Sequence, residues 1–471
     1  MKSHLRVLKF GGTSLGDAEC IRNAVEAVAK AKSGGPAVVV VSAMSGVTSQ
    51  LLDAATHVTQ GKPKMAEDLS RFLLDHHELA IQTLISNRNV AIRCFAELEQ
   101  IVEGAACLLE TFYKDKGLNP SALDGLLGTG EQLSARLFAA ALQDRGLNAV
   151  PMDASKLIVT NSAHGNADPL MDQSRDRILR LVPTTLKRGF IPVVTGFVGA
   201  TEEGLATTLG RGGSDYTATI FGAALNAEEI FIWTDVDGVL TADPRSVPEA
   251  RTIPEITYQE ATELACLGAK VLHPKTLNPV SGKQIPVWIR NSFNPTASGT
   301  RIGAQRKPVS RGIRAVTCRT DVSLIRVRTN ARDQFLSQAV RTLAAPEKAI
   351  AQFFPSSTNI SQDELLFVAG TEEIEASMRL FDNFKALAPR QMGLGNPQID
   401  TEIALVSIVG NSLDSGTSRR ALKAMSRSDI QPRAEVQGLS KNNLCFVVPQ
   451  ESARRTLAAF HREFFENTGD D

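Results

Sequence analysis

The chain carries the stretch Thr208-Leu209-Gly210-Arg211-Gly212-Gly213-Ser214-Asp215-Tyr216, a glycine-rich turn that opens onto an apolar helical pattern over 214–225. Three glycines in four positions let backbone amides approach an anion closely, and a helix N-terminus favours negative charge. Arg211 can hold a carboxylate or a phosphate through two parallel hydrogen bonds, and Asp215 can orient cationic groups. Taken alone, the segment fits an anion-binding loop and an ordinary glycine turn with a solvated arginine equally well.

A second glycine turn lies near the N-terminus. The sequence Val7-Leu8-Lys9-Phe10-Gly11-Gly12-Thr13-Ser14 is a short apolar strand followed by two glycines and two hydroxyl residues, and helical apolar spacing follows over 17–31. Strand, Gly-Gly turn and helix form a geometry that can hold phosphates, with Lys9 placed to meet a polyphosphate. The chain contains neither Gly-x-x-x-x-Gly-Lys-Ser/Thr nor Gly-x-Gly-x-x-Gly, which argues against a P-loop and a Rossmann site. A lysine at a strand end is also common on an ordinary surface.

Composition and charge exclude several classes of protein. The 471 residues are 43% hydrophobic and 22% charged, which is typical of a globular protein with more than one domain. Formal net charge is zero and the isoelectric point is near 7.1, so electrostatics give no reason to expect binding to nucleic acid or to a membrane. Six scattered cysteines, no signal segment and no apolar run near the roughly 20 residues that span a bilayer predict a reduced, cytoplasmic protein.

Residues 1–300 alternate short β-branched runs with longer helical patterns. The run 38–41 is apolar without alternation, as expected for a strand covered on both faces. The pattern predicts an α/β domain with a mostly parallel central sheet, helices on both faces, and a helical insert over about 50–115. In this insert the adjacent His76 and His77 lack a third ligand, which favours a solvated or capping role over metal binding. The expected strands are 5–10, 36–43, 147–152, 190–198, 228–233 and 285–289, and the expected helices are 17–32, 48–60, 66–86, 90–113, 131–145, 172–188, 214–225 and 257–267.

The rest of the chain has a different pattern of expected strands and helices. Residues 291–313 are rich in turn formers and predict a domain boundary. About 80 residues separate equivalent strands beyond it, which indicates a tandem repeat of two small β-α-β units. The first unit is expected to have strands at 322–328 and 364–368 with a helix at 333–345, and the second to have strands at 403–409 and 443–448 with helices at 416–427 and 450–466.

Four segments resemble the signature segments of the aspartate kinases, which belong to the amino acid kinase family. They are Lys9-Phe-Gly-Gly-Thr-Ser14, residues 208–218, Trp233-Thr-Asp-Val-Asp-Gly238 with Asp243-Pro-Arg245, and Gly268-Ala-Lys-Val-Leu-His-Pro274. They occur in the family's order and span about residues 5–300. The resemblance implies the amino acid kinase fold over residues 1–300, followed by two α+β modules that resemble ACT domains, over 314–390 and 400–471.

This resemblance implies transfer of the γ-phosphoryl group of ATP to the side-chain carboxylate of L-aspartate, with Mg²⁺ as the metal. Such a transfer needs cations where charge gathers on the phosphoryl group, and no strong base, because the acceptor carboxylate is already ionised. Lys9 is the expected main cation, assisted by the backbone amides of Gly11 and Gly12. Lys270 is the expected second cation, on the nucleotide side. Asp215 is expected to hold the lysines in place through ion pairs.

The substrate needs an acceptor for its ammonium group and donors for its carboxylates. By resemblance, Glu131 in Gly128-Thr-Gly-Glu-Gln-Leu-Ser134 is expected to bind the ammonium group. A glutamate in the first turn of a helix often only complements the helix dipole, which is the alternative. Arg211 and Ser214 are expected to bind the α-carboxylate, and Thr48 resembles the family's substrate threonine.

The nucleotide is expected across the segment from Trp233 to Arg245. Thr234 and Asp235 end a strand, which is the usual side for ligands in open α/β sheets. Arg245 is expected to reach the phosphates. Leu240 stands where many relatives have a tyrosine, so one contact on the adenine side is expected to differ. No metal site formed by protein groups alone is expected.

The C-terminal modules imply regulation by an amino acid, for which lysine or threonine is the expected effector. The second module matches the ACT pattern well in Val406-Ser-Ile-Val-Gly410, whereas the first has Gln334-Phe335-Leu336 where the family often has Gly-Phe-Leu. Because ACT modules commonly pair across subunits, a homodimer or a higher homo-oligomer is expected. The alternative for this region is a dimerisation module without a ligand.

Two other functions remain open at this point. One is a sibling kinase that acts on glutamate, acetylglutamate or a nucleoside monophosphate, and the other is an amino-acid sensor without catalysis. By resemblance, the set of Thr48, Glu131 and Arg211 favours aspartate. The residues assigned to phosphoryl transfer argue against a sensor, which has no need of phosphoryl-stabilising cations.

Overall fold

The computed structural model describes residues 4–269, 271–304, 312–328, 364–370, 396–411, 413–437, 440 and 442–466. These residues form two compact units. The first unit comprises the described residues of Met1–Val239, Pro254–Tyr258 and Leu272–Ala304, and the second comprises those of Leu240–Ile253, Gln259–Val271 and Gln305–Asp471. Lys270 and the segment 334–336 lie outside the described residues.

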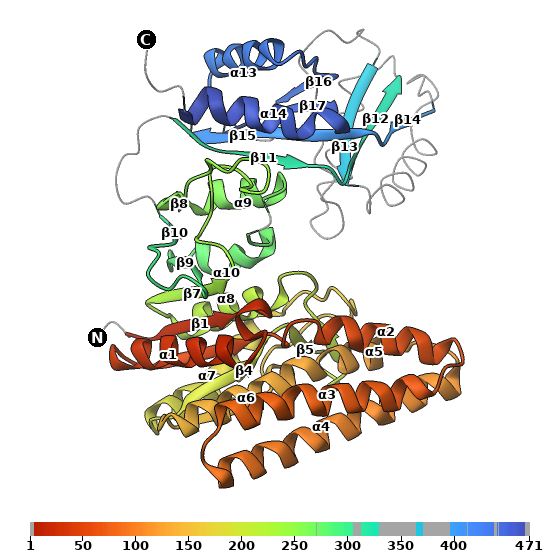
Figure 1. The fold of residues 1–471 in the computed structure, drawn as a ribbon, viewed down its shortest axis with the longest axis vertical. Coiled ribbons are helices and arrows are strands. Elements are labelled where there is room, and N and C mark those ends of the chain that lie inside the picture. The colour runs from red at the N-terminus through yellow and green to blue at the C-terminus, as the bar shows by residue number, and fades with distance from the viewer. Residues whose placement is uncertain are drawn as a thin grey trace. The chain divides into compact units, whose positions relative to one another are not determined.

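An eight-stranded sheet forms the centre of the first unit (Figure 1). The strand order is β3-β4-β2-β1-β7-β9-β10-β8, and every neighbouring pair is parallel except β9 and β10. All residues of β2 and β4 are buried, because helices cover both faces of the sheet. The strands are β1 (Arg6–Phe10), β2 (Ala37–Val41), β3 (Ala149–Met152), β4 (Ile191–Thr195), β7 (Glu229–Thr234), β8 (Glu255–Thr257), β9 (Val287–Asn291) and β10 (Thr300–Gly303).

Helices α1 and α6 pack on β2 from one side, and α8 packs on β1 and β2 from the other. Helices α2, α3 and α4 pack against one another as the expected helical insert (Figure 1). None of the helices that the structure describes is both long and apolar enough to cross a membrane. The helices of this unit are α1 (Ala18–Ser33), α2 (Val47–Thr59), α3 (Lys64–Leu84), α4 (Arg88–Asp115), α5 (Pro120–Leu127), α6 (Thr129–Asp144), α7 (Met171–Lys187), α8 (Gly213–Leu225) and α10 (Asn278–Ser281), with 3-10 turns η1 (Thr13–Leu15), η2 (Ala154–Lys156) and η3 (Pro274–Leu277).

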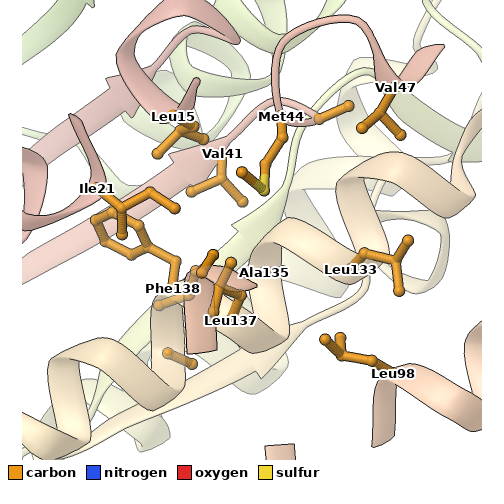
Figure 2. Packing of buried hydrophobic residues seen from close by; sticks show 14 of the residues in the cluster. Leu15, Ile21, Val41, Met44, Val47, Leu98, Leu133, Ala135, Leu137 and Phe138 are labelled. Carbon is orange, nitrogen blue, oxygen red and sulfur yellow. The ribbon is translucent and has the colours of Figure 1, made fainter. Parts of the chain in front are cut away.

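One hydrophobic cluster joins α1, α2, α4 and α6 to strands β1 and β2 (Figure 2). Phe138 of α6 stacks on Phe10 of β1 with ring centroids 5.5 Å apart, and Leu98 of α4 and Val41 of β2 are fully buried in the same cluster. Each large apolar side chain buried in this way contributes about 1.5–3 kcal/mol. This packing fixes the carboxyl ends of β1 and β2, where the glycine turn after Phe10 begins.

The expected strand at 190–198 is wrong in its second half. It ends at Thr195, and Phe197 adopts a left-handed φ of 70°, which turns the chain out of the sheet. The chain then forms a two-stranded ribbon from β5 (Val198–Ala200) and β6 (Ala206–Thr208). The ribbon, α5, β8 and β10 are elements that the sequence pattern does not predict. The other expected strands and helices of residues 1–300 are confirmed with slightly shifted ends.

Two antiparallel sheets form the second unit, with strand orders β11-β15-β17-β16 and β13-β12-β14. The strands expected in the C-terminal modules and the helix at 416–427 are confirmed, whereas the helix expected at 450–466 is divided into three segments. The helix expected at 333–345 lies outside the described residues. The elements are β11 (Gly312–Arg319), β12 (Val322–Arg328), β13 (Glu364–Gly370), β14 (Gln398–Asp400), β15 (Ile403–Asn411), β16 (Ala434–Gln437), β17 (Asn443–Pro449), α9 (Tyr258–Cys266), α13 (Ser415–Arg427), η6 (Gln450–Ser452), α14 (Ala453–His461) and the π-helical η7 (Arg462–Glu466).

A loop that the sequence places inside the kinase region, Leu240–Ile253, packs in the second unit. Its residues Ala242 and Val247 are buried in one cluster with Val316 of β11 and Phe446 of β17. The loop is closed by a β-bridge between its two ends, at Leu240 and Thr252. The packing therefore does not follow a contiguous boundary near residue 300, because the apolar side chains of this loop find their partners in the second unit.

Candidate active site

Lys9 and Asp215 form a buried ion pair at the carboxyl end of the sheet. Lys9 lies in β1, and since side chains alternate along a strand, it faces α8 while Leu8 and Phe10 face the cluster with α6. Its Nζ is 2.6 Å from the Oδ1 of Asp215, in the first turn of α8, and the two side chains are 10% and 13% exposed. Ions that are this well shielded interact much more strongly than a surface pair.

The turn after β1 brings backbone close to this lysine. The Gly11 amide donates to the carbonyl of Trp233 at 3.2 Å, which ties the turn to the end of β7. A Cβ on Gly12 would lie 3.1 Å from the carbonyl oxygen of Ala43, after β2, so the turn packs tightly against this second strand end. The turn at Gly11 and Gly12 lies directly beside Lys9, since a Cβ on Gly11 would lie 3.3 Å from the Lys9 Nζ. The amide of Gly12 can contribute to an anion there, whereas that of Gly11 is engaged with Trp233.

Glu131 is buried at the start of α6 and is 3% exposed. Its Oε1 accepts a hydrogen bond from the Ala43 amide at 3.1 Å, and its Oε2 has no hydrogen-bond partner within the part of the chain that the structure describes. Burial raises the pKa of Glu131 to about 8, and the Ala43 amide and the charge of Lys9 only partly oppose this rise. A buried carboxylate oxygen without a partner is unfavourable unless a cation meets it. Glu131 is thus not a solvated carboxylate at a helix end.

The loop between β6 and α8 carries Arg211 and Ser214. Gly212, just before the helix, has a left-handed φ of 70°, and a Cβ on it would lie 2.7 Å from the Cβ of His273, so only glycine fits. Ser214 lies in the first turn of α8 and is buried, whereas Arg211 is exposed. Thr48 occupies the first turn of α2 and is half-buried. These side chains come from the same unit as Lys9.

Thr234 is the last residue of β7 and Asp235 follows it, next to β1 in the sheet, where Phe10 pairs with Trp233. The Thr234 hydroxyl donates to the Asp235 carboxylate at 3.1 Å. A pair of serines that the sequence did not single out as a pair lies here: Ser292, directly after β9, donates to Ser14 at 2.6 Å, and Ser14 donates to the Trp233 carbonyl at 3.2 Å. Such a cluster could be predicted from the sequence, because polar residues directly follow strands that are neighbours in a parallel sheet.

Three further predicted residues do not belong to the described part of the first unit. Leu240 and Arg245 belong to the second unit, where the Arg245 guanidinium meets the Asp243 carboxylate at 2.7 and 3.0 Å. Lys270 lies outside the described residues, so its predicted role stays a prediction. The expectation of a solvated or capping role is wrong for His77, which is fully buried, with Nδ1 2.7 Å from the Leu73 carbonyl and a pKa lowered to about 4 by burial.

The described residues include no group of three or more His, Cys, Asp or Glu that could hold a metal ion. Mg²⁺ commonly keeps several waters and is held by one or two carboxylates together with substrate phosphates. Asp235, exposed after β7, and the phosphates of a bound nucleotide would suit that mode of binding. The buried lysine, the close glycine turn and the strand-end hydroxyls also fit the polyphosphate of a nucleotide.

Known proteins resemble this chain over nearly its whole length. A model of the amino acid kinase family matches residues 4–291, and a model of an ACT domain matches residues 406–464. Lysine-sensitive aspartokinase 3 of Escherichia coli (strain K12) is 32% identical, over 98% of this chain and 100% of that protein. Solved structures of E. coli aspartokinase III in complex with aspartate and ADP, and with lysine and aspartate, have TM-scores of 0.83 and 0.72 at 29% and 28% identity, each covering 98% of this chain and 100% of that chain. The chain therefore belongs to the amino acid kinase family and, within it, to the aspartokinases.

Proposed function

We propose that the protein is an aspartate kinase, a phosphotransferase with a carboxyl acceptor, which converts L-aspartate and ATP to 4-phospho-L-aspartate and ADP. This reaction is the first step toward lysine, threonine and methionine. The observation that carries the proposal is the buried pair of Lys9 and Asp215 beside Glu131, whose Oε2 has no partner among the described residues. A buried cation suits phosphoryl transfer, and a buried carboxylate oxygen suits an ammonium group. The related E. coli enzyme has been solved with aspartate and ADP, which supports the same substrates here.

Each substrate group has a counterpart among the residues of the first unit. Glu131 binds the ammonium group of aspartate through Oε2. Arg211 and Ser214 bind its α-carboxylate, and Thr48 adds a hydroxyl at the start of α2. The side-chain carboxylate of aspartate is already ionised near neutral pH, so the site needs no general base to activate it.

Lys9 stabilises the charge that gathers on the transferring phosphoryl group, and Gly12 adds its backbone amide. The Gly11 amide would add to this only by leaving the Trp233 carbonyl, to which it donates in the free protein. Asp215 holds Lys9 in one position, which avoids reorganisation during the reaction. Asp235 would help to hold Mg²⁺, which would further neutralise the phosphate oxygens when bound. Thr234, Leu240, Arg245 and Lys270 complete the nucleotide side.

The ACT region implies a regulatory ligand. We infer that lysine is the effector, because the related E. coli enzyme has also been solved with lysine and aspartate. Threonine is the alternative. A homodimer or a higher homo-oligomer that forms through the ACT modules is part of the same proposal.

The deciding experiment measures L-aspartate-dependent acyl phosphate, trapped as the hydroxamate, with MgATP. L-Glutamate and N-acetyl-L-glutamate run beside it as alternative acceptors. A signal with aspartate alone supports the proposal, and a signal with another acceptor favours a sibling kinase. Protein that binds ATP and yet phosphorylates none of the acceptors would contradict the kinase and favour a sensor.

A further inference from the structure

Asp124, on α5, is a buried carboxylate that the proposed chemistry does not use. It is 2% exposed, on a short helix that is not part of the glycine turns. Its Oδ1 accepts from the Thr208 hydroxyl at 2.8 Å, and its Oδ2 accepts from the Gly165 amide at 2.9 Å. The Nδ1 of His164 lies 3.3 Å from the same Oδ2. One carboxylate thus joins three segments that are far apart in the sequence.

Thr208 is the residue from which the Arg211 loop departs. It ends β6, is 1% exposed, and is held on both sides, since its carbonyl accepts from the Ala167 amide at 2.8 Å while its hydroxyl bonds to Asp124. The next residue is held as well, because the Leu209 amide donates to the Phe197 carbonyl at 2.8 Å. The start of the loop therefore has little freedom to move.

The turn at 164–166, which Asp124 also holds, packs directly on this loop. A Cβ on Gly210 would lie 2.6 Å from the side-chain Oδ1 of Asn166, so the Asn166 side chain packs directly on the backbone of Gly210. Gly210 has a left-handed φ of 75° and its carbonyl accepts from the Gly213 amide at 3.0 Å, which closes the turn around Arg211. A shift of Thr208 or of the 164–166 turn would thus be transmitted to Arg211.

We propose that Asp124 is a positioning residue for the amino-acid substrate: through Thr208 and Gly165 it holds the Arg211 loop in the geometry that binds the α-carboxylate. The proposal rests on the proposed function for Arg211. The proposal predicts that loss of Asp124 weakens the binding of aspartate and not that of ATP, because the segments held by Asp124 are connected to the loop of Arg211. If Asp124 only stabilised the fold, its loss would lower stability without any preference for one substrate.

The test removes single hydrogen bonds and follows both substrates. Thr208→Val deletes the hydroxyl at nearly constant volume, and Thr208→Ser restores it without the methyl group. We expect Thr208→Val to raise KM for aspartate about tenfold, which is the size expected for one charge-assisted hydrogen bond. KM for ATP should stay within about twofold, and Thr208→Ser should behave as wild type. Asp124→Asn serves as a second variant if Thr208→Val fails to fold.

Thr207→Val is the matched control. Thr207 is the neighbouring residue of β6, is fully buried, and forms a hydroxyl pair with Thr160 at 2.7 Å that does not involve Asp124. It should lose stability to a similar degree with both KM values unchanged. In the double variant Asp124→Asn/Thr208→Val, the rise in KM for aspartate should be smaller than the product of the two single-variant rises, because both changes act on the same hydrogen-bonded group.

Three results would overturn the proposal: KM values for aspartate and ATP that rise together, a Thr207→Val variant that raises KM for aspartate as much as Thr208→Val, or a folded Thr208→Val with unchanged KM. Failure of the proposed function is distinguishable, since wild-type protein would then form no aspartyl hydroxamate. Wild-type activity with unaffected variants would reject the role of Asp124 alone.

Discussion

The amino-acid side and the nucleotide side of the proposed site are built in different ways. On the amino-acid side, Glu131 and Ser214 are buried side chains of the first unit, and the loop of Arg211 is tied to that unit by buried hydrogen bonds. On the nucleotide side, Thr234 at the end of β7 and Asp235 directly after it belong to the first unit. The loop that follows packs in the second unit, where Thr241 is hydrogen-bonded to the buried His461 at 3.0 Å.

This difference suggests how an ACT region can regulate a kinase. The contacts described for the amino-acid side lie within the first unit. The loop from Leu240 to Ile253 is part of the hydrophobic cluster of the second unit. A ligand that changes the packing of the second unit would act on this loop directly, and we expect such a change to alter nucleotide binding first.

The largest effect on turnover should come from removing the charge of Lys9, which the proposal places at the transferring phosphoryl group, between the amino acid and the nucleotide. Lys9→Met removes the charge and keeps the apolar stem, so we expect kcat to fall by roughly 100–1,000-fold or more, as for the loss of other groups that stabilise transition-state charge. The hydroxamate assay measures it, with circular dichroism to verify folding. Lys30→Met, at an exposed lysine of α1, is the control and should leave kcat unchanged. A folded Lys9→Met protein with near-normal turnover would remove Lys9 from the proposed chemistry.

Glu131→Gln should separate the two sides. We expect KM for aspartate to rise by roughly 10–100-fold, because a charged hydrogen bond to the ammonium group is lost, while KM for ATP changes little. Glu19→Gln is the matched control, since Glu19 also lies in the first turn of a helix but is exposed. If both variants behave alike, Glu131 only complements the helix dipole.

The pH dependence of KM for aspartate tests the role of Glu131 more specifically. The pKa of Glu131 is raised to about 8 in the free protein, so below that pH the carboxyl must lose a proton before it can pair with the ammonium group. KM for aspartate should therefore rise toward tenfold for each pH unit below about 8, and aspartate binding should release a proton. The profile should be flat over the same range in Glu131→Gln. A wild-type profile without this slope would contradict a protonated Glu131 in the free enzyme.

The same carboxyl predicts a stability effect in the free protein. Because the folded pKa is raised, the folded state keeps a proton that the unfolded state has lost between about pH 5 and pH 8. The free energy of unfolding should thus fall as pH rises through this range, by on the order of 2–4 kcal/mol for this residue. Urea titrations at several pH values measure it. Glu131→Gln should lose this dependence, and an unchanged slope in the variant would assign it to other groups.

Much of the first unit could be predicted from the sequence. The apolar runs of β1, β2 and β4 have no alternation because both faces are covered, and the strand–Gly-Gly–helix order placed Lys9 at the end of its strand. The buried state of Glu131 could not be predicted, since a glutamate in the first turn of a helix has the same local pattern whether it is solvated or covered by Ala43 and its neighbours. Glu131 is identified as a candidate by the resemblance to the aspartate kinases, and not by the periodicity of the sequence.

Contacts between distant segments account for the rest. Asp124 and Thr208 are 84 residues apart in the sequence. Their hydrogen bond could not be predicted, because the apolar pattern around each residue does not show that it has a buried polar partner in another segment. The loop from Leu240 to Ile253 could not be assigned to the second unit for a similar reason. Val247 is recognisably apolar, but an apolar residue does not indicate which of two cores it will join.

The smallest effect tests whether that loop connects the second unit to the nucleotide. Val247 is 2% exposed in the cluster of the second unit, and Val247→Ala should lower the free energy of unfolding by about 1–3 kcal/mol. We expect a few-fold rise in KM for ATP, with KM for aspartate unchanged, because the packing of the nucleotide-side loop loosens. Val28→Ala, in the buried face of α1, is a matched truncation in the first unit and should destabilise without this preference. If Val247→Ala raises KM for aspartate instead, the two sides of the site are not built separately, and the route for regulation must begin elsewhere.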